Sequence, residues 1–271
     1  MRLRFRHAAA LTTAATLVLM LLGVLTAATG TGLSCQAQWP FCDGGLFPAS
    51  LASVPEWAHR AVAMVVGFAI LGLGAAAWRG ERPKRERLAT AAAVVILPTQ
   101  IVLGAVTVTL GGLIPGGYSV PVQVAHFATA LSIFGLLAAT SAWAAGGDDA
   151  RVRAALLWSA ALAPAYAVVS RGLLFPPSVP MQALAYGVGL ALFAALLCAA
   201  LWTDVEQLRR ALAGLLAVLS GHLLLGRALY SVFPAADAVY LLGTGVVVAA
   251  TVLVAAFVYR SRPGAHGGAA A

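Results

Sequence analysis

Charged residues are scarce in this sequence: only 10% are Asp, Glu, Lys or Arg, whereas a soluble globular domain has about a quarter. Hydrophobic residues make up 61% of the chain, and its mean hydropathy is +0.92. This composition excludes an ordinary soluble domain. The sequence therefore predicts a protein whose apolar segments lie in a lipid bilayer.

Long apolar runs divide the chain into eight segments. A helix of about 18 or more apolar residues spans the roughly 30 Å hydrocarbon core of a bilayer. We read such runs at 8–29, 56–78, 88–112, 121–145, 152–172, 178–202, 209–232 and 236–259. The first run is too long for the core of a signal peptide and lacks a convincing cleavage site, so we treat it as a span. We expect an all-α polytopic membrane protein with eight transmembrane helices.

Acidic residues are scarcer than basic ones, 9 against 17, which gives a formal net charge of +8. Such an excess can indicate a nucleic-acid partner, but its distribution argues against one. Fourteen of the 17 basic residues lie in segments that fall on one side of the membrane, at 2–6, 79–87, 151–153, 209–210 and 260–262. The positive-inside rule assigns that side to the cytoplasm. We expect cytoplasmic N and C termini, a location in the prokaryotic plasma membrane or its equivalent, and no nucleic-acid partner.

Cysteine is rare, and two of the three cysteines lie in one unusual passage, GLSCQAQWPFCDGGLFP at 32–48. Cys35 and Cys42 fall on the expected outer side, where disulfides form. We favour a disulfide over two free thiols, and no nearby histidine or third cysteine completes a metal site. Cys198 lies within a span and is expected to be a packing residue.

The two halves of the chain show weak internal similarity. VPEWAHRAV from Val54 matches VPMQALAYG, QIVLGAVTV from Gln100 matches HLLLGRALY, and QVAHFATAL from Gln123 matches DAVYLLGTG. We therefore expect two four-helix halves, 1–146 and 147–271, related as a pseudo-twofold repeat. In this alignment His59 faces Leu184, and His126 faces Tyr240.

Histidine is also rare, with five in the chain. His59 and His126 lie near the outer ends of two different spans. Ionisable groups in spans are costly and indicate function by default. Two imidazoles at matching depth suit the axial ligation of a heme iron, one on each face. The alternative is that each makes an interhelical hydrogen bond. Considered together, the two histidines favour a cofactor site.

Glu56 and Arg60 flank His59 in the sequence EWAHR. Glu56 is three residues from His59 and so shares a face of the helix with it. Its carboxylate is suited to relay protons or to bind a ligand, or it only stabilises the start of the helix. Arg60 is placed to pair with a carboxylate of a cofactor or to reach the lipid headgroups. Arg171 and Arg227 also lie in the outer halves of their spans.

These motifs together resemble the heme A synthase family, membrane enzymes that convert heme O to heme A for terminal oxidases. The resemblance rests on TGTGLSCQAQWPFCDGGLFP, EWAHR, QIVLGAVTV and VAHFATA, in that order and at similar spacing. It covers about residues 10–145 well, and the second half only through its architecture.

The resemblance implies that His59 and His126 frame the heme O site and that Glu56 is the functional glutamate. It also implies that Cys35 and Cys42 form an outer-loop pair that caps the site. The implied reaction oxidises a porphyrin methyl to a formyl, with oxygen drawn from water. Heme O synthase and a terminal oxidase are the expected partners.

The second half departs from the family pattern. The family's second histidine pair, which holds heme b, falls at Leu184 and Tyr240. Leucine cannot ligate iron, and tyrosine does so in a different class of heme site, so heme b in this half is in doubt. His222 is either a substitute ligand or, as we favour, a residue that makes an interhelical hydrogen bond.

Two other functions fit part of the sequence. A b-type electron carrier would use His59 and His126 without chemistry on the porphyrin. A transporter fits the repeat, but the spans lack broken helices and midplane charges. Extracted heme distinguishes the enzyme, which yields O- or A-type heme, from the carrier, which yields only b-type heme.

Overall fold

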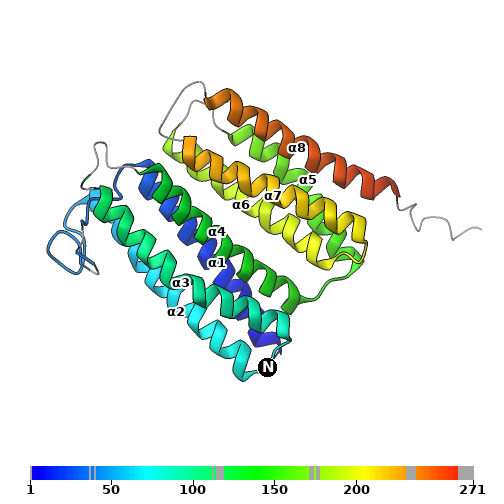
Figure 1. Cartoon of the computed structure of the whole chain (residues 1–271), viewed down its shortest axis with the longest axis horizontal. Coiled ribbons are helices and arrows are strands. Elements are labelled where there is room, and N and C mark those ends of the chain that lie inside the picture. Colours follow the sequence, from blue (N-terminus) through cyan, green and yellow to red (C-terminus); the bar gives the residue numbers. More distant parts are fainter. Residues whose placement is uncertain are drawn as a thin grey trace, which may run out of the picture.

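The regular structure of the described chain consists of helices that lie side by side (Figure 1). The computed structural model describes residues 2–36, 38–39, 41–111, 113, 119–170, 174, 178–229 and 236–261. Its long helices are α1 Arg2–Ala28, α2 Val54–Arg79, α3 Lys84–Gly111, α4 Val120–Ala145, α5 Asp149–Val169, α6 Val179–Trp202, α7 Glu206–Leu229 and α8 Ala236–Ser261.

These eight helices are each long and apolar enough to cross a membrane, which confirms the predicted all-α membrane fold. Each corresponds to one of the expected spans. Pro164 lies inside α5 and Pro98 inside α3. Prolines are tolerated in membrane helices because neighbouring groups satisfy the freed backbone carbonyls.

Local sequence explains where several helices begin. Each of α2, α4 and α6 starts with Val-Pro, so that Pro55, Pro121 and Pro180 occupy the first turn. Proline suits this position because its missing N–H would have no partner inside the helix. Two helices are capped by side chains: Asp148 accepts from the Arg151 amide before α5, and Ser178 accepts from the Met181 amide before α6.

The helices form two groups with the same order of contacts. In the first group α1 contacts α2 and α4, and α3 contacts α2 and α4. In the second group α5 contacts α6 and α8, and α7 contacts α6 and α8. The groups meet where α1 contacts α6 and where α4 contacts α6 and α7. This shared order supports the two-half repeat, which stays a proposal.

Arginines gather with aromatic rings where α2 ends and α3 begins. Arg82 lies over the Phe5 ring at 4.7 Å, and its Nε donates to the Glu86 carboxylate at 2.8 Å. Arg85 lies over the Trp143 ring at 5.5 Å. These contacts hold the ends of α1, α3 and α4 together through cation–π attraction and a buried ion pair. The assignment of this end to the cytoplasm stays a prediction.

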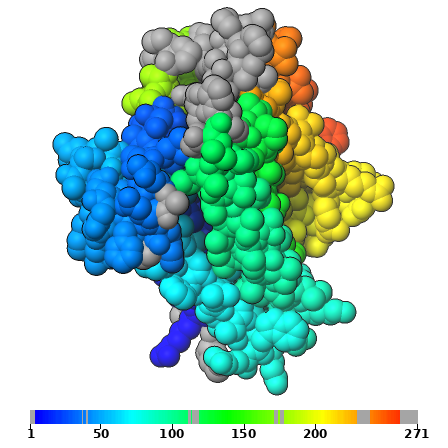
Figure 2. Space-filling model, turned by 60° about the vertical axis from the view of Figure 1, so that its left-hand side comes forward, coloured from blue at the N-terminus to red at the C-terminus, as the bar shows by residue number. Residues whose placement is uncertain are grey.

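The loop between α1 and α2 projects from the bundle at the opposite end (Figures 1 and 2). It closes with a short 3₁₀ helix, Leu51–Ser53. Asp43 organises this closure: its carboxylate accepts from the amides of Ala49 and Ser50 at 3.0 and 3.1 Å, and from the Ser53 hydroxyl at 3.0 Å. Partial desolvation raises the pKa of Asp43, but these hydrogen bonds outweigh it, so the pKa lies below its ordinary value of 3.8.

The depressed pKa of Asp43 predicts acid-sensitive order in the loop. A carboxyl whose pKa is lowered by folding stabilises the folded loop above its unfolded pKa, and this contribution is lost as the pH falls through the lower, folded value. Hydrogen exchange of residues 44–53, corrected for intrinsic rates, should show protection at pH 6 that declines below about pH 4.

Asp43→Asn is the matched variant, because Asp43 has φ +52° and asparagine tolerates this left-handed region. It keeps the shape of the side chain and removes its charge. We expect weak protection with no acid transition. Protection that is equal in the two proteins at pH 6 would contradict the proposed role of the carboxylate.

Candidate functional site

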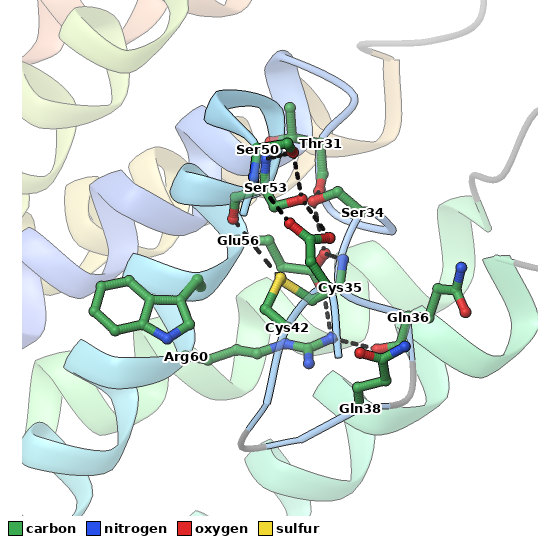
Figure 3. The surroundings of a disulfide bond; sticks show 12 residues. Thr31, Ser34, Cys35, Gln36, Gln38, Cys42, Ser50, Ser53, Glu56 and Arg60 are labelled. Carbon is green, nitrogen blue, oxygen red and sulfur yellow. Dashed lines mark hydrogen bonds and ion pairs between the residues drawn. A yellow bond between two sulfur atoms is a disulfide. The ribbon is translucent and has the colours of Figure 1, made fainter. Parts of the chain in front are cut away.

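Cys35 and Cys42 form the predicted disulfide, which lies buried at the base of the loop (Figure 3). The Cα atoms of the two cysteines are 4.6 Å apart. A backbone turn reinforces the bridge, since the Cys42 amide donates to the Gly45 carbonyl at 2.8 Å and the Gly45 amide donates back at 3.0 Å. The disulfide therefore fixes the path of the chain next to the first turn of α2.

Glu56 joins this loop to α2. The carboxylate is buried, with 3% of the residue exposed. Its Oε2 accepts from the Cys35 amide at 2.7 Å and from the Ser34 hydroxyl at 3.2 Å (Figure 3). Glu56 lies in the first turn of α2, as the helix-start interpretation requires. Its hydrogen bonds show that it also holds the loop, a role that the sequence did not reveal.

Arg60 completes the network one turn further along α2. Its guanidinium forms an ion pair with Oε1 of Glu56, and Nη2 donates to the Gln36 carbonyl at 2.6 Å. Arg60 thus binds the carboxylate and the loop, whereas the sequence suggested a cofactor carboxylate or the lipid headgroups as its partner.

His59 points from α2 toward α1. Its ring packs on Gly23 of α1 so closely that a Cβ at this glycine would lie 3.0 Å from Cε1 of His59. The backbone carbonyl of Leu19, also on α1, lies near the ring, yet Nδ1 makes no hydrogen bond of normal geometry to the described residues. A ligating imidazole needs such an acceptor to fix its tautomer.

His126 occupies a similar position between α4 and α3. A Cβ at Gly104 of α3 would lie 3.4 Å from Cε1 of His126. The amide nitrogen of Gln100 lies 3.4 Å from Nε2 of His126, and Oε1 of Gln100 accepts from the Thr129 hydroxyl. At 3.4 Å the contact with the histidine is long and weak. The Nδ1 atom of His126 has no hydrogen-bond partner in the described chain.

The two histidines lie close enough for their charges to interact, and all four helices of the first group help to position them. Among the described residues, no three His, Cys, Asp or Glu side chains gather in a way that could hold a metal ion. Two imidazoles are too few for a protein-built metal centre, but they match the two axial positions that a porphyrin leaves open on its iron. The donor set therefore fits a heme.

Gln100 and Gly104 contact or lie against His126, but the sequence analysis used them only as part of a motif, for the repeat and for the family resemblance. The signal was present in the sequence, because a polar side chain inside an apolar span commonly makes a functional or interhelical contact. Glycine at position 104 allows the close approach of an aromatic ring. The sequence did not show that either residue contacts His126, because the spacing of residues along one helix does not identify their partners on another helix.

Arg227 of α7 reaches from the second group of helices to α4. It is buried, with 3% exposed, and its Nη2 donates to Oε1 of Gln123 at 3.2 Å. The guanidinium lies over the rings of Phe127 and Tyr186, at 6.0 and 5.9 Å from their centroids. Its charge is also near enough to interact with His126. Arg171, the other arginine expected in this layer, lies outside the described residues.

Comparison with known proteins identifies related sequences for part of the chain. A family of cytochrome oxidase assembly proteins, COX15-CtaA, matches residues 52–174. This match includes Glu56, His59, Arg60 and His126, and it begins after the disulfide loop.

Two kinds of relative are similar to the chain. A heme A synthase from Bacillus licheniformis is 35% identical over 126 residues, which are 46% of this chain and 40% of the relative. A protoheme IX farnesyltransferase from Halobacterium salinarum is also 35% identical over 126 residues, which are 27% of that protein. Another farnesyltransferase, from Thermus thermophilus, is 30% identical over 138 residues, 23% of its length. The chain therefore spans well under half the length of these relatives.

Proposed function

We propose that the chain, whose residues 52–174 match the COX15-CtaA family of cytochrome oxidase assembly proteins, is a heme A synthase. It is a multi-pass protein of the cell membrane with eight apolar helices. The observation that carries the proposal is the histidine pair of the first half. His59 and His126 lie on two helices inside the family match, and each has an Nδ1 atom without a hydrogen bond to the described residues.

Heme O is the proposed substrate, and His59 and His126 are the residues that would hold its iron. Each ring is fixed by a neighbouring helix: His59 by Gly23 and the Leu19 carbonyl, and His126 by Gly104 and Gln100. Such supporting contacts set the orientation of a ligating imidazole. A porphyrin held by these two histidines would lie near the end of the bundle that carries the disulfide loop.

The reaction converts one porphyrin methyl to a formyl and takes the new oxygen from water. Methyl plus water gives formyl, four protons and four electrons, and an electron acceptor outside this chain must take up the electrons. A proton acceptor near the methyl is therefore required. Glu56 is suited to this role because it lies on the same side of α2 as His59, and its ion pair with Arg60 holds the carboxylate in position. Proton transfer by a positioned carboxylate contributes typically 10²–10⁴-fold to a rate.

The disulfide loop acts as the outer cap of the site. It binds Glu56 through the Cys35 amide, so the position of the loop and that of the carboxylate depend on each other. Closing a short loop with a disulfide limits the freedom of the unfolded chain. We assign Cys35 and Cys42 this structural role ahead of electron exchange with a partner.

The relatives suggest the supplier of the substrate. The chain is similar to heme A synthases over 126 residues and to proteins named protoheme IX farnesyltransferase over 126 and 138 residues, which are 27% and 23% of the length of those proteins. We propose that the chain works beside a farnesyltransferase, which would deliver an apolar heme within the membrane. A terminal oxidase is the proposed recipient of the product, in accord with the name of the family.

Extracted heme tests the activity directly. We would express the full chain with a heme O synthase and identify the hemes by chromatography and mass spectrometry. Formyl-bearing heme A should appear only when both proteins are present. Protein that carries b-type heme and forms no A-type heme would instead favour the electron carrier.

Replacing either His59 or His126 with alanine should lower the amount of bound heme by more than about tenfold, because each variant lacks one of the two proposed iron ligands. Heme per polypeptide and the absorption spectrum measure the effect. His7→Ala is the matched control, since His7 is exposed on α1 and should leave both unchanged. Wild-type heme content and spectrum in the two site variants would refute the ligand assignment.

Glu56→Gln should retain bound heme O and lower the rate of formyl formation by about 100-fold or more. The amide keeps the shape and hydrogen bonding of the side chain but cannot accept a proton. The control is Glu86→Gln, since Glu86 is also buried and paired with an arginine four residues away, at the other end of the bundle. Normal conversion of heme O by Glu56→Gln would show that the residue serves only to anchor the loop.

A further inference from the structure

Four aromatic rings fill the interior of the second group of helices. They come from all four helices: Tyr166 of α5, Tyr186 of α6, His222 of α7 and Tyr240 of α8. All four side chains are buried. The imidazole of His222 stacks on the Tyr240 ring with centroids 4.3 Å apart and an interplanar angle of 26°, and it meets Tyr166 edge-on at 5.9 Å. Tyr166, His222 and Tyr240 are thus in direct ring contact.

Hydrogen bonds close this cluster on itself. The hydroxyls of Tyr166 and Tyr240 are 2.9 Å apart, and the Tyr186 hydroxyl donates to the Leu223 carbonyl at 3.1 Å. Nε2 of His222 lies 3.1 Å from the Thr244 hydroxyl, which donates to the Tyr240 carbonyl. His222 therefore makes the interhelical hydrogen bond that we favoured for it, and this bond uses one of its two ring nitrogens.

Three glycines show how tightly the rings are packed. A Cβ at Gly226 would lie 2.9 Å from both the Tyr186 hydroxyl and the Tyr240 ring, and a Cβ at Gly243 would lie 2.6 Å from Nδ1 of His222. A Cβ at Gly189 would lie 2.9 Å from the Tyr166 ring. These positions cannot accept a methyl group without a shift of their neighbours. The volume that a porphyrin requires is filled by protein.

The ligands for a second heme are also missing from the interior. The sequence contains no histidine in α6 or α8, and Leu184, which aligns with His59, is 46% exposed and lies on the outside of the bundle. Tyr240, which aligns with His126, is bound to Tyr166 and His222. Nδ1 of His222 faces the backbone of Gly243, so no iron can reach it.

We infer that the second half binds no heme and that the chain has a single heme site. This inference concerns the second half and goes beyond the proposed reaction. Gly226 aligns with Gly104, and Tyr240 aligns with His126. In each half the aligned ring packs against the aligned glycine, but the two contacts serve different purposes. In the first half the contact presents a ligand, and in the second it packs a core. Electrons from the oxidation of heme O therefore leave by a route without a second heme.

Heme stoichiometry tests this inference. The full chain is purified from cells that make heme O, and heme and polypeptide are quantified separately. We expect one heme per chain in the wild type, none in the His59→Ala/His126→Ala double variant, and one in both His222→Ala and Tyr240→Phe. Two hemes in the wild type, or heme in the double variant that disappears on adding His222→Ala, would overturn the inference. A wild type without heme would refute the proposed function and still agree with a heme-free second half.

Packing gives a second measurement that does not depend on heme loading. Gly226→Ala should lower the thermal unfolding temperature by about 5 °C, because a methyl group collides with Tyr186 and Tyr240. Gly221→Ala is the matched control on α7, since no atom lies within 4 Å of a Cβ at that position. It should leave the temperature unchanged or raise it slightly. Equal stability of the two variants would show an open interior and contradict the inference.

Discussion

A buried carboxylate in a membrane protein must find its partners inside the protein, and the arrangement at Glu56 follows from this constraint. Its oxygens take an amide and a hydroxyl from the loop and a guanidinium from α2. An unpaired charge at this place would cost several kcal/mol. The loop therefore cannot leave α2 without exposing the carboxylate, and the disulfide keeps its amide in place. The order of the loop and the position of the Glu56 carboxylate therefore depend on one network.

The sequence predicted the features that depend on chain composition. Hydropathic runs gave the eight helices, and the Cys35–Cys42 spacing on the outer side gave the disulfide. It did not predict which faces meet. Helices that are apolar all round have no stripe to indicate their inward side, so the exposure of Leu184 and the contact of Gln100 with His126 required coordinates. Loop contacts to Glu56 were equally hidden, because they use backbone amides that every residue has.

Glycine placement explains how two similar four-helix groups can differ in chemistry. Small residues allow membrane helices to approach closely. At the two glycines compared here, a ring from the neighbouring helix packs against the glycine. Beside Gly104 the ring is His126, whose nitrogen has only a long contact with Gln100. Beside Gly226 the ring is Tyr240, stacked on His222 and bonded to Tyr166. The two groups thus share one order of helices, but the ring beside the glycine is an imidazole in the first group and a packed tyrosine in the second.

A second half without heme still has a structural task, because α4 belongs to both cores. Phe127, Leu131 and Phe134 of α4 pack with the second group, whereas Ile133 and Leu137 pack with the first. Arg227 adds a hydrogen bond to Gln123, one turn before His126. The rotation of α4 about its axis is therefore fixed from the side of the second group, and this rotation sets the direction of the His126 ring. The ring cluster supplies a rigid surface for that purpose, which a partly empty porphyrin pocket would not.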